Sequence, residues 1–245
     1  SFDHYDYFLL KGITGSGKTE VYLNVIEEVL KKGKQVLVLV PEITLIAPMA
    51  KRLKSRFDQV AIYHSALSQG EKFDQYRMIF ENNATIVLGT RSAVFLPLES
   101  LGLIVIDEEH DQSYQQTEGV FYDAKQIAHK RALYHNIPLV LGSATPSIET
   151  MYLALNKKIK LLELTKRPLD IKLPKITLID MKEELNRGNS SIFSTALIEA
   201  IKKRLEKHEQ IMLLFNRKGY APFVLCRQCG DVPRCPDCDI SLTYY

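Results

Sequence analysis

The chain has 245 residues, enough for one large domain or two smaller ones, and a net charge of +3 that allows a nucleic-acid partner without predicting one. Its hydrophobic share of 46% and charged share of 25% are ordinary for a globular protein and exclude a low-complexity or disordered class. No apolar stretch approaches a membrane-spanning length and no signal peptide opens the chain, so we expect a soluble intracellular protein without a membrane partner. The first expected strand follows Ser1 closely, and we expect the chain to be a piece of a longer protein.

A phosphate-binding loop occupies residues 12–19, which read G-I-T-G-S-G-K-T and match the pattern G-x-x-x-x-G-K-[ST]. An apolar run at 8–11 predicts a strand before the loop, and apolar residues at helical spacing predict a helix over 20–32. Glycines let backbone N–H groups wrap a polyphosphate at the helix N-terminus. A chance glycine-rich turn is the alternative. We predict that a nucleoside triphosphate is bound by Gly12, Thr14, Gly15, Ser16, Gly17, Lys18 and Thr19.

Alternating apolar runs and helical patterns continue along the chain. Buried-type strands are expected at 36–40, 86–88, 103–106, 139–141, 176–179 and 211–215. Helices are expected at 44–57, 71–81, 123–135, 147–155 and 194–207. This alternation predicts an α/β fold with a parallel sheet covered by helices on both faces. Residues 167–175 contain two prolines and predict a linker, which divides the chain into domains at 1–166 and 176–245.

An acidic turn, D-E-E-H, follows the apolar run 103–106. Carboxylates at a strand end beside a phosphate loop suit Mg²⁺ chemistry, so we predict that Asp107 and the Thr19 hydroxyl hold the ion. Glu108 is expected to orient or deprotonate an attacking water, and Lys18 to reach the β- and γ-phosphates. His110 either couples nucleotide state to another site or caps the turn. A solvated acidic turn without catalytic function is the alternative.

A second polar segment, G-S-A-T-P-S at 142–147, also follows an expected strand. Its small hydroxyl residues, Ser143 and Thr145, are expected to hydrogen-bond the acidic turn across adjacent strand ends and relay its state. The same segment is also a good helix start, with Thr145 or Ser147 as the N-cap.

The phosphate loop, D-E-E-H and S-A-T, in this order, resemble the superfamily 2 helicases. Further blocks (L-V-P-E-I-T-L, H-S-A-L-S, G-T-R-S-A-V-F-L-P-L and N-R-K-G-Y-A-P) are similar to the primosomal replication-restart helicases. The resemblance implies a RecA-like lobe, the start of a second RecA-like lobe with a zinc-knuckle insertion, and an ATP- and Mg²⁺-dependent 3′→5′ DNA helicase of the bacterial cytoplasm and nucleoid. It implies as partners forked or single-stranded DNA, replication-restart (primosome) proteins and single-stranded-DNA-binding protein.

The resemblance also implies DNA contacts at Thr90, Arg91 and Ser92, where hydroxyls and a guanidinium suit phosphate oxygens. The segment 111–124 carries Tyr114, Phe121 and Tyr122 and resembles an aromatic-rich loop that couples strand binding to hydrolysis. Exposed aromatic rings stack on unpaired bases. A surface salt bridge is the alternative for Arg91, and rings buried to pin the loop to the lobe are the alternative for the aromatics.

Two cysteine pairs, Cys226 with Cys229 and Cys235 with Cys238, have zinc-knuckle spacing. Only five residues separate the pairs, against about 15–20 in common four-cysteine sites, so each pair is expected to serve a different ion. The resemblance implies two zinc sites built from eight cysteines, of which this chain would hold half the ligands, from about residue 226.

Helicases of this class hydrolyse ATP between two lobes, and the motifs that supply the second lobe's arginine are not found in this chain. We therefore expect ATP binding with weak turnover and no processive unwinding. Two other classes stay open: a P-loop kinase, and a zinc-dependent docking module of the primosome with a vestigial motor. Hydrolysis stimulated by DNA would separate the three.

Overall fold

A computed structural model describes residues 4–166, 174–214, 231–232 and 234–236. The chain forms two compact units, at 1–171 and 172–245, and each is described by itself. No helix among the described residues is long and apolar enough to cross a membrane. The domain limits expected from the sequence, with a linker at 167–175, stay a prediction.

The first unit contains a seven-stranded sheet in the order β3-β4-β2-β5-β8-β1-β9, in which every strand pair is parallel. The predicted parallel α/β fold is therefore confirmed. Because all the strands run the same way, the ends of the central ones (β2, β5, β8 and β1) meet at one edge of the sheet. The strands are β1 (Tyr7–Gly12), β2 (Gln35–Leu39), β3 (Val60–Tyr63), β4 (Ile86–Gly89), β5 (Leu101–Ile106), β8 (Leu139–Ser143) and β9 (Lys160–Leu164).

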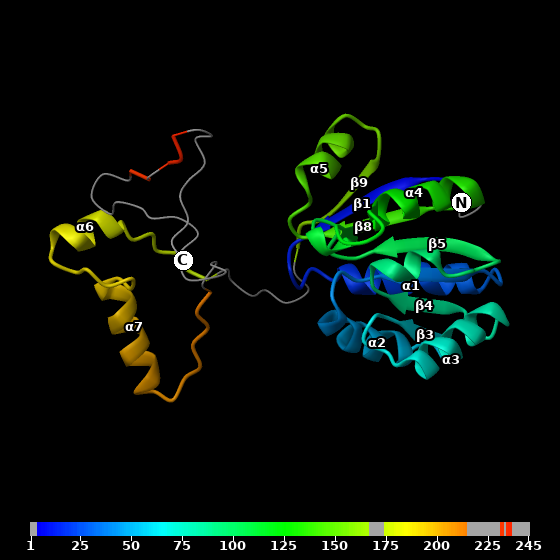
Figure 1. Cartoon of the computed structure of the whole chain (residues 1–245), viewed down its shortest axis with the longest axis horizontal. Coiled ribbons are helices and arrows are strands. Elements are labelled where there is room, and N and C mark those ends of the chain that lie inside the picture. Colours follow the sequence, from blue (N-terminus) through cyan, green and yellow to red (C-terminus); the bar gives the residue numbers. More distant parts are fainter. Residues whose placement is uncertain (1–3, 167–173, 215–230, 233, 237–245) are drawn as a thin grey trace. The chain divides into compact units, whose positions relative to one another are not determined.

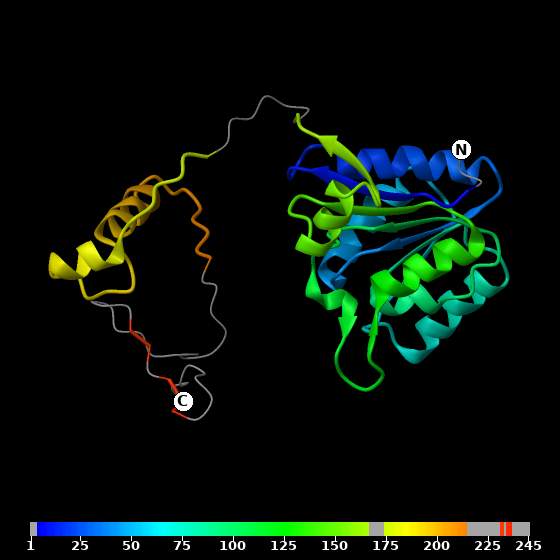
Figure 2. The same ribbon diagram turned by 90° about the horizontal axis from the view of Figure 1, so that it is seen from above.

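Helices cover both faces of the sheet and bury two separate cores (Figures 1 and 2). Helices α1 (Lys18–Leu30) and α2 (Ile46–Lys54) pack on one face, where Ile26 and Leu53 are fully buried. Helices α3 (Gln69–Phe80), α4 (Ala124–His135) and α5 (Ile148–Leu155) pack on the other. Each strand of the centre is apolar on both sides, because neither face meets water.

The two edge strands, β3 and β9, were not expected from the sequence. Both are short, and β9 carries two charged residues, Lys160 and Glu163, which form ion pairs with Asp6 and Lys11 of neighbouring segments. At the other edge the Ile62 amide donates to Gln75 Oε1 of α3 at 2.8 Å. Charged residues interrupt the apolar run in β9, whereas β3 reads V-A-I-Y, an apolar run of four residues that the sequence analysis missed.

Between β5 and α4 the chain forms three short 3₁₀ or strand segments that extend from the sheet. The 3₁₀ turn η3 (Gln112–Tyr114) leads into β6 (Gln115–Gln116), which pairs antiparallel with β7 (Tyr122–Asp123). We call residues 115–123 the hairpin. Two further 3₁₀ turns, η1 (Ile43–Leu45) and η2 (Arg91–Phe95), follow β2 and β4.

The described part of the second unit contains two helices, α6 (Met181–Asn186) and α7 (Thr195–Leu205), joined through Glu184, whose carboxylate accepts from the Thr195 amide at 2.6 Å. The strands predicted at 176–179 and 211–215 are wrong where the structure describes them, because 176–179 and 211–214 have no regular structure. Leu178 and Leu214 are 92% and 91% exposed. An apolar run becomes a strand only when neighbouring strands pair with it, and the described residues of this unit offer none.

Candidate nucleotide-binding and catalytic site

The phosphate loop connects β1 to α1, as predicted. Gly15 and Gly17 have φ of +79° and +93°, in the left-handed region that side chains avoid. Gly17 is the N-cap of α1, and the Ser16 amide donates back to Ile13 O at 2.9 Å, which closes the turn. The exposed Thr14 and the half-buried Thr19 lie on either side of that turn. The loop therefore presents the free N–H groups of a helix N-terminus, which bind anions.

Gly12 lies close to side chains of the loop, so a larger residue at this position would displace Ser16 Oγ. A Cβ on Gly12 would lie 2.4 Å from Ser16 Oγ and 3.2 Å from Lys18 Cγ. Ser16 Oγ is buried and has no hydrogen-bond partner among the described residues. A buried hydroxyl without a partner is costly unless a ligand supplies one. The residues present therefore fit a bound polyphosphate.

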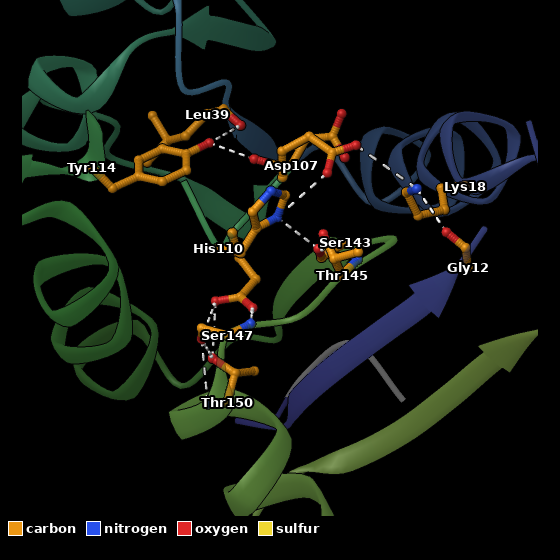
Figure 3. Close-up of polar contacts among 12 residues, drawn as sticks. Gly12, Lys18, Leu39, Asp107, His110, Tyr114, Ser143, Thr145, Ser147 and Thr150 are labelled. Atoms are coloured by element: carbon orange, nitrogen blue, oxygen red, sulfur yellow. Dashed lines mark hydrogen bonds and ion pairs between the residues drawn. The ribbon is translucent and has the colours of Figure 1, made fainter. Parts of the chain in front are cut away.

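Lys18 begins α1 and extends back over the loop (Figure 3). Its side chain is 10% exposed, and Nζ donates to Gly12 O at 2.9 Å and lies 3.8 Å from Glu108 Oε1. The ammonium group thus lies between the phosphate loop and the acidic turn, where it would meet a bound phosphate chain.

Asp107 follows the last residue of β5. Its Oδ1 accepts a hydrogen bond from Tyr22 Oη of α1 at 2.9 Å. Burial raises the pKa of the Asp107 carboxyl above its usual range, against the opposing effects of the Tyr22 hydrogen bond and the positive charges of Lys18 and Arg52. Burial also keeps the pKa of Tyr22 well above its usual range, so Tyr22 remains a donor. A nearby cation would be expected to favour the charged carboxylate.

Glu108 has a φ of +46°, a left-handed conformation that is uncommon for a residue with a side chain. Burial and the neighbouring Asp107 charge raise its pKa, while Lys18 and His110 oppose the rise. Such strained backbones and shifted carboxyls are concentrated at functional sites. Glu108 and Asp107 lie together at the end of β5, as the sequence predicted, and Lys18 adjoins them.

The acidic turn and the S-A-T segment are in direct contact. His110 Nδ1 is 2.8 Å from Ser143 Oγ and 3.6 Å from Glu108 Oε2 (Figure 3). Ser143 Oγ also accepts from the Thr145 amide at 3.0 Å, whereas the N-cap of α5 is Ser147. The expected hydrogen bond between this segment and the acidic turn is therefore present, through Ser143, and Thr145 takes part through its backbone.

Glu109, the third residue of the acidic turn, was not predicted. Its carboxylate is fully buried and accepts from the Ser147 amide at 2.7 Å, from the Ser147 and Thr150 hydroxyls at 3.0 and 2.9 Å, and from Lys125 Nζ at 3.2 Å. It joins the turn to the start of both α4 and α5. The sequence predicted a helix start with Ser147 as a candidate N-cap, but nothing local indicated that a carboxylate 38 residues away would accept from it.

Tyr114 corrects one expectation. It is fully buried, and its hydroxyl lies 2.6 Å from Asp107 O and 3.1 Å from Leu39 O (Figure 3). A ring without exposed surface does not stack on a base, so Tyr114 pins the loop to the lobe, which was the alternative. Phe121 directly precedes β7 and is 76% exposed. The Tyr122 ring packs edge-on against Phe95, with the ring centroids 4.9 Å apart.

Among the residues that the structure describes, Arg91 has no acidic partner for the surface salt bridge that was the alternative to a DNA contact. Its Nη1 donates to Ser113 O at 3.1 Å and to Gln115 O at 2.9 Å, and so fastens η2 to the start of the hairpin. Thr90 is buried and its amide donates to Tyr63 O, while Ser92 is half-buried. DNA contact by these three residues stays a prediction.

Three of the four predicted zinc ligands, Cys226, Cys229 and Cys238, lie outside the described residues, and Cys235 lies within them. Across residues 4–166, 174–214 and the short described stretches beyond, no group of three His, Cys, Asp or Glu side chains is placed to hold a metal. Zinc binding stays a prediction from the cysteine spacing.

A phosphate loop at the start of α1, with an acidic turn and a hydroxyl segment at the adjacent strand ends, is the arrangement of a P-loop protein of the helicase class. Residues 4–153 match the family described as DEAD/DEAH box helicase, and the chain belongs to this family.

The chain is similar to proteins named replication restart protein PriA. It is 51% identical to that of Bacillus subtilis (strain 168) over 99% of this chain and 30% of the relative. It is 42% identical to that of Haemophilus influenzae over 98% of this chain and 33% of the relative. The chain thus spans about a third of the length of these curated relatives.

Solved structures agree on the fold. RecG bound to a three-way DNA junction matches 82% of this chain and 28% of its own, at 23% identity and a TM-score of 0.51. The Pyrococcus furiosus Hef helicase domain matches 82% of this chain and 50% of its own, at 20% identity and a TM-score of 0.50.

Proposed function

We propose that this chain is the ATP-binding part of a PriA-type replication-restart enzyme, an ATP-dependent 3′→5′ DNA helicase acting at stalled forks. The observation that carries the proposal is the position of Lys18 Nζ, 2.9 Å from Gly12 O and 3.8 Å from Glu108 Oε1. One cation therefore joins the anion-binding loop to the acidic turn. The similarity to PriA proteins over nearly the whole chain supports the helicase function and a DNA partner.

Each group of residues in the site has a separate proposed role. The loop amides of 13–19 bind and orient the phosphate chain, and Lys18 exchanges its bond to Gly12 O for phosphate oxygens. Thr19 and Asp107 would hold Mg²⁺, which when bound neutralises charge on the β- and γ-phosphates. Glu108, with a pKa raised by burial and by Asp107, is suited to accept a proton from the attacking water.

Contacts within the lobe would couple the state of the bound nucleotide to DNA binding. His110 links Glu108 to Ser143, and Tyr114 and Arg91 fasten the hairpin that carries Phe121. Primosome proteins and single-stranded-DNA-binding protein are proposed partners by similarity to PriA alone. Because the transition-state arginine of such motors belongs to a second lobe, we expect weak turnover from this chain.

ATP binding and hydrolysis, measured with and without forked DNA, test the proposal in wild type, Lys18→Ala and Lys31→Ala. Lys31 is the matched control because it lies at the other end of α1 in exposed pairs with Glu27 and Glu28. We expect Lys18→Ala to abolish ATP binding and Lys31→Ala to leave it unchanged. Binding that is indifferent to Lys18 would overturn the proposal. Stimulation by a small phosphate acceptor instead of DNA would indicate a kinase. Lys18-dependent binding without turnover would indicate a sound first lobe that lacks the second lobe's arginine, whereas binding that ignores Lys18, with a response to neither DNA nor acceptor, would indicate a docking module.

The cysteine pairs carry a second, smaller proposal: this chain holds half of a two-zinc module. Metal analysis of the purified chain should find fewer than two tightly bound zinc ions per molecule. Two tightly held ions would show that four cysteines suffice and that the module is complete.

A further inference from the structure

We infer that Tyr22 is a positioning residue for the Mg²⁺ site, holding the Asp107 carboxylate in one orientation through its hydroxyl. The inference rests on the proposed function and assigns it a residue outside the phosphate loop, the acidic turn and the S-A-T segment. Tyr22 lies one turn into α1, is 2% exposed, and donates from Oη to Asp107 Oδ1 at 2.9 Å.

The space for this contact is made by a glycine on a third element. A Cβ on Gly142, in β8, would lie 1.6 Å from Tyr22 Oη and 3.3 Å from Asp107 Oδ1. The tyrosine hydroxyl therefore reaches the carboxylate through a gap that a side chain at 142 would close. A tyrosine buried only for its apolar ring would not need this gap, because the gap surrounds the hydroxyl.

The bond fixes one oxygen of Asp107 and leaves the other for a metal or a metal-bound water. A free aspartate rotates about its terminal torsion, whereas a charge-assisted hydrogen bond from a buried donor holds one orientation. Partners that orient metal-binding carboxylates in this way typically change metal affinity about 10–100-fold when they are removed. Tyr114 acts on the backbone of the same residue, through Asp107 O, so it does not substitute for Tyr22.

The test measures binding of a fluorescent, non-hydrolysable ATP analogue during Mg²⁺ titration, and in EDTA, for wild type and Tyr22→Phe. We expect Tyr22→Phe to raise the Mg²⁺ concentration for half-maximal effect about tenfold. Affinity in EDTA should stay within about twofold, because Lys18 and the loop amides do not depend on Tyr22. Electron paramagnetic resonance of Mn²⁺ in the same complex gives a readout independent of turnover.

Tyr7→Phe is the matched control, since Tyr7 is a half-buried tyrosine of β1 whose ring stacks on His129 at 5.0 Å. It should not change the Mg²⁺ requirement. In an Asp107→Ala background Tyr22→Phe should add no further shift, because its effect passes through that carboxylate. Melting curves verify that each variant is folded at the assay temperature.

Four outcomes are distinct. Equal loss of affinity with and without Mg²⁺, or no change in the Mg²⁺ requirement, would overturn the inference and leave the nucleotide site standing. A shift that persists in the Asp107→Ala background would also overturn it. If binding of the ATP analogue does not depend on Lys18 in the protein that retains Tyr22, the proposed function itself is refuted.

Discussion

The Glu109 carboxylate and the Lys125 ammonium lie 3.2 Å apart, with the glutamate side chain fully buried and the lysine 21% exposed. Three further donors from Ser147 and Thr150 surround the same carboxylate. One residue thus joins the acidic turn to the N-terminal turns of two helices. The contact lies next to Glu108, which we propose as a catalytic residue, but it stabilises the fold.

Glu109→Ala is expected to lower the free energy of unfolding by about 3–5 kcal/mol, because it leaves Lys125 and three donors without their buried partner. Urea denaturation measures the change. The control is Glu163→Ala, which removes an exposed ion pair with Lys11 and should cost no more than about 1 kcal/mol. Similar losses for both variants would contradict the role assigned to Glu109.

Gly142→Ala should destabilise the lobe by about 1–3 kcal/mol, because the new methyl group would overlap Tyr22 Oη. Gly70→Ala provides the comparison: this glycine lies in the first turn of α3 with open space around it. Alanine there should stabilise by up to about 1 kcal/mol. The melting temperatures of the two variants should therefore shift in opposite directions. A Gly142→Ala variant of unchanged stability would mean that the Tyr22 side chain moves aside at no cost.

His129 should make the stability of the lobe depend on pH. Burial lowers its pKa, so the folded state binds the proton less readily than the unfolded chain. Its contribution is full above the ordinary histidine pKa and declines as the pH falls through that value toward the lowered one. His129→Phe keeps the ring stacked on Tyr7 and should reduce the loss between about pH 7.5 and pH 5.5. His135 has a pKa lowered in the same direction, so part of the slope should remain. An unchanged slope of stability against pH would refute the assignment.

Phe121→Ala should weaken single-stranded DNA binding by about 1–3 kcal/mol while leaving ATP affinity and folding unchanged, because the ring is 76% exposed. Fluorescence anisotropy with labelled DNA measures the loss. Phe73→Ala is the control, since Phe73 is 64% exposed on α3 and is not among the residues proposed to contact DNA. Equal effects of the two substitutions would remove the hairpin from that path.

Local patterns predicted the parts of the site that are local in sequence. Strand β1, the phosphate loop and α1 are contiguous, and the apolar run of β5 leads directly into Asp107 and Glu108, so both could be predicted from spacing. Tyr22 and Glu109 could not, because their hydrogen-bond partners lie 85 and 38 residues away. Tertiary packing also decided the role of Tyr114. The resemblance to an aromatic-rich coupling loop favoured an exposed ring, whereas the fold places its hydroxyl on two backbone carbonyls.

The bond from the Ile62 amide to Gln75 has a consequence for aggregation. An edge strand with free amides is a template for pairing with a strand of another molecule. On β3, Gln75 of α3 already accepts a hydrogen bond from one of those amides. On β9, the charged side chains of Lys160 and Glu163 disfavour pairing with a strand of another molecule. We therefore expect both edges of the parallel sheet to pair poorly with a strand of another molecule.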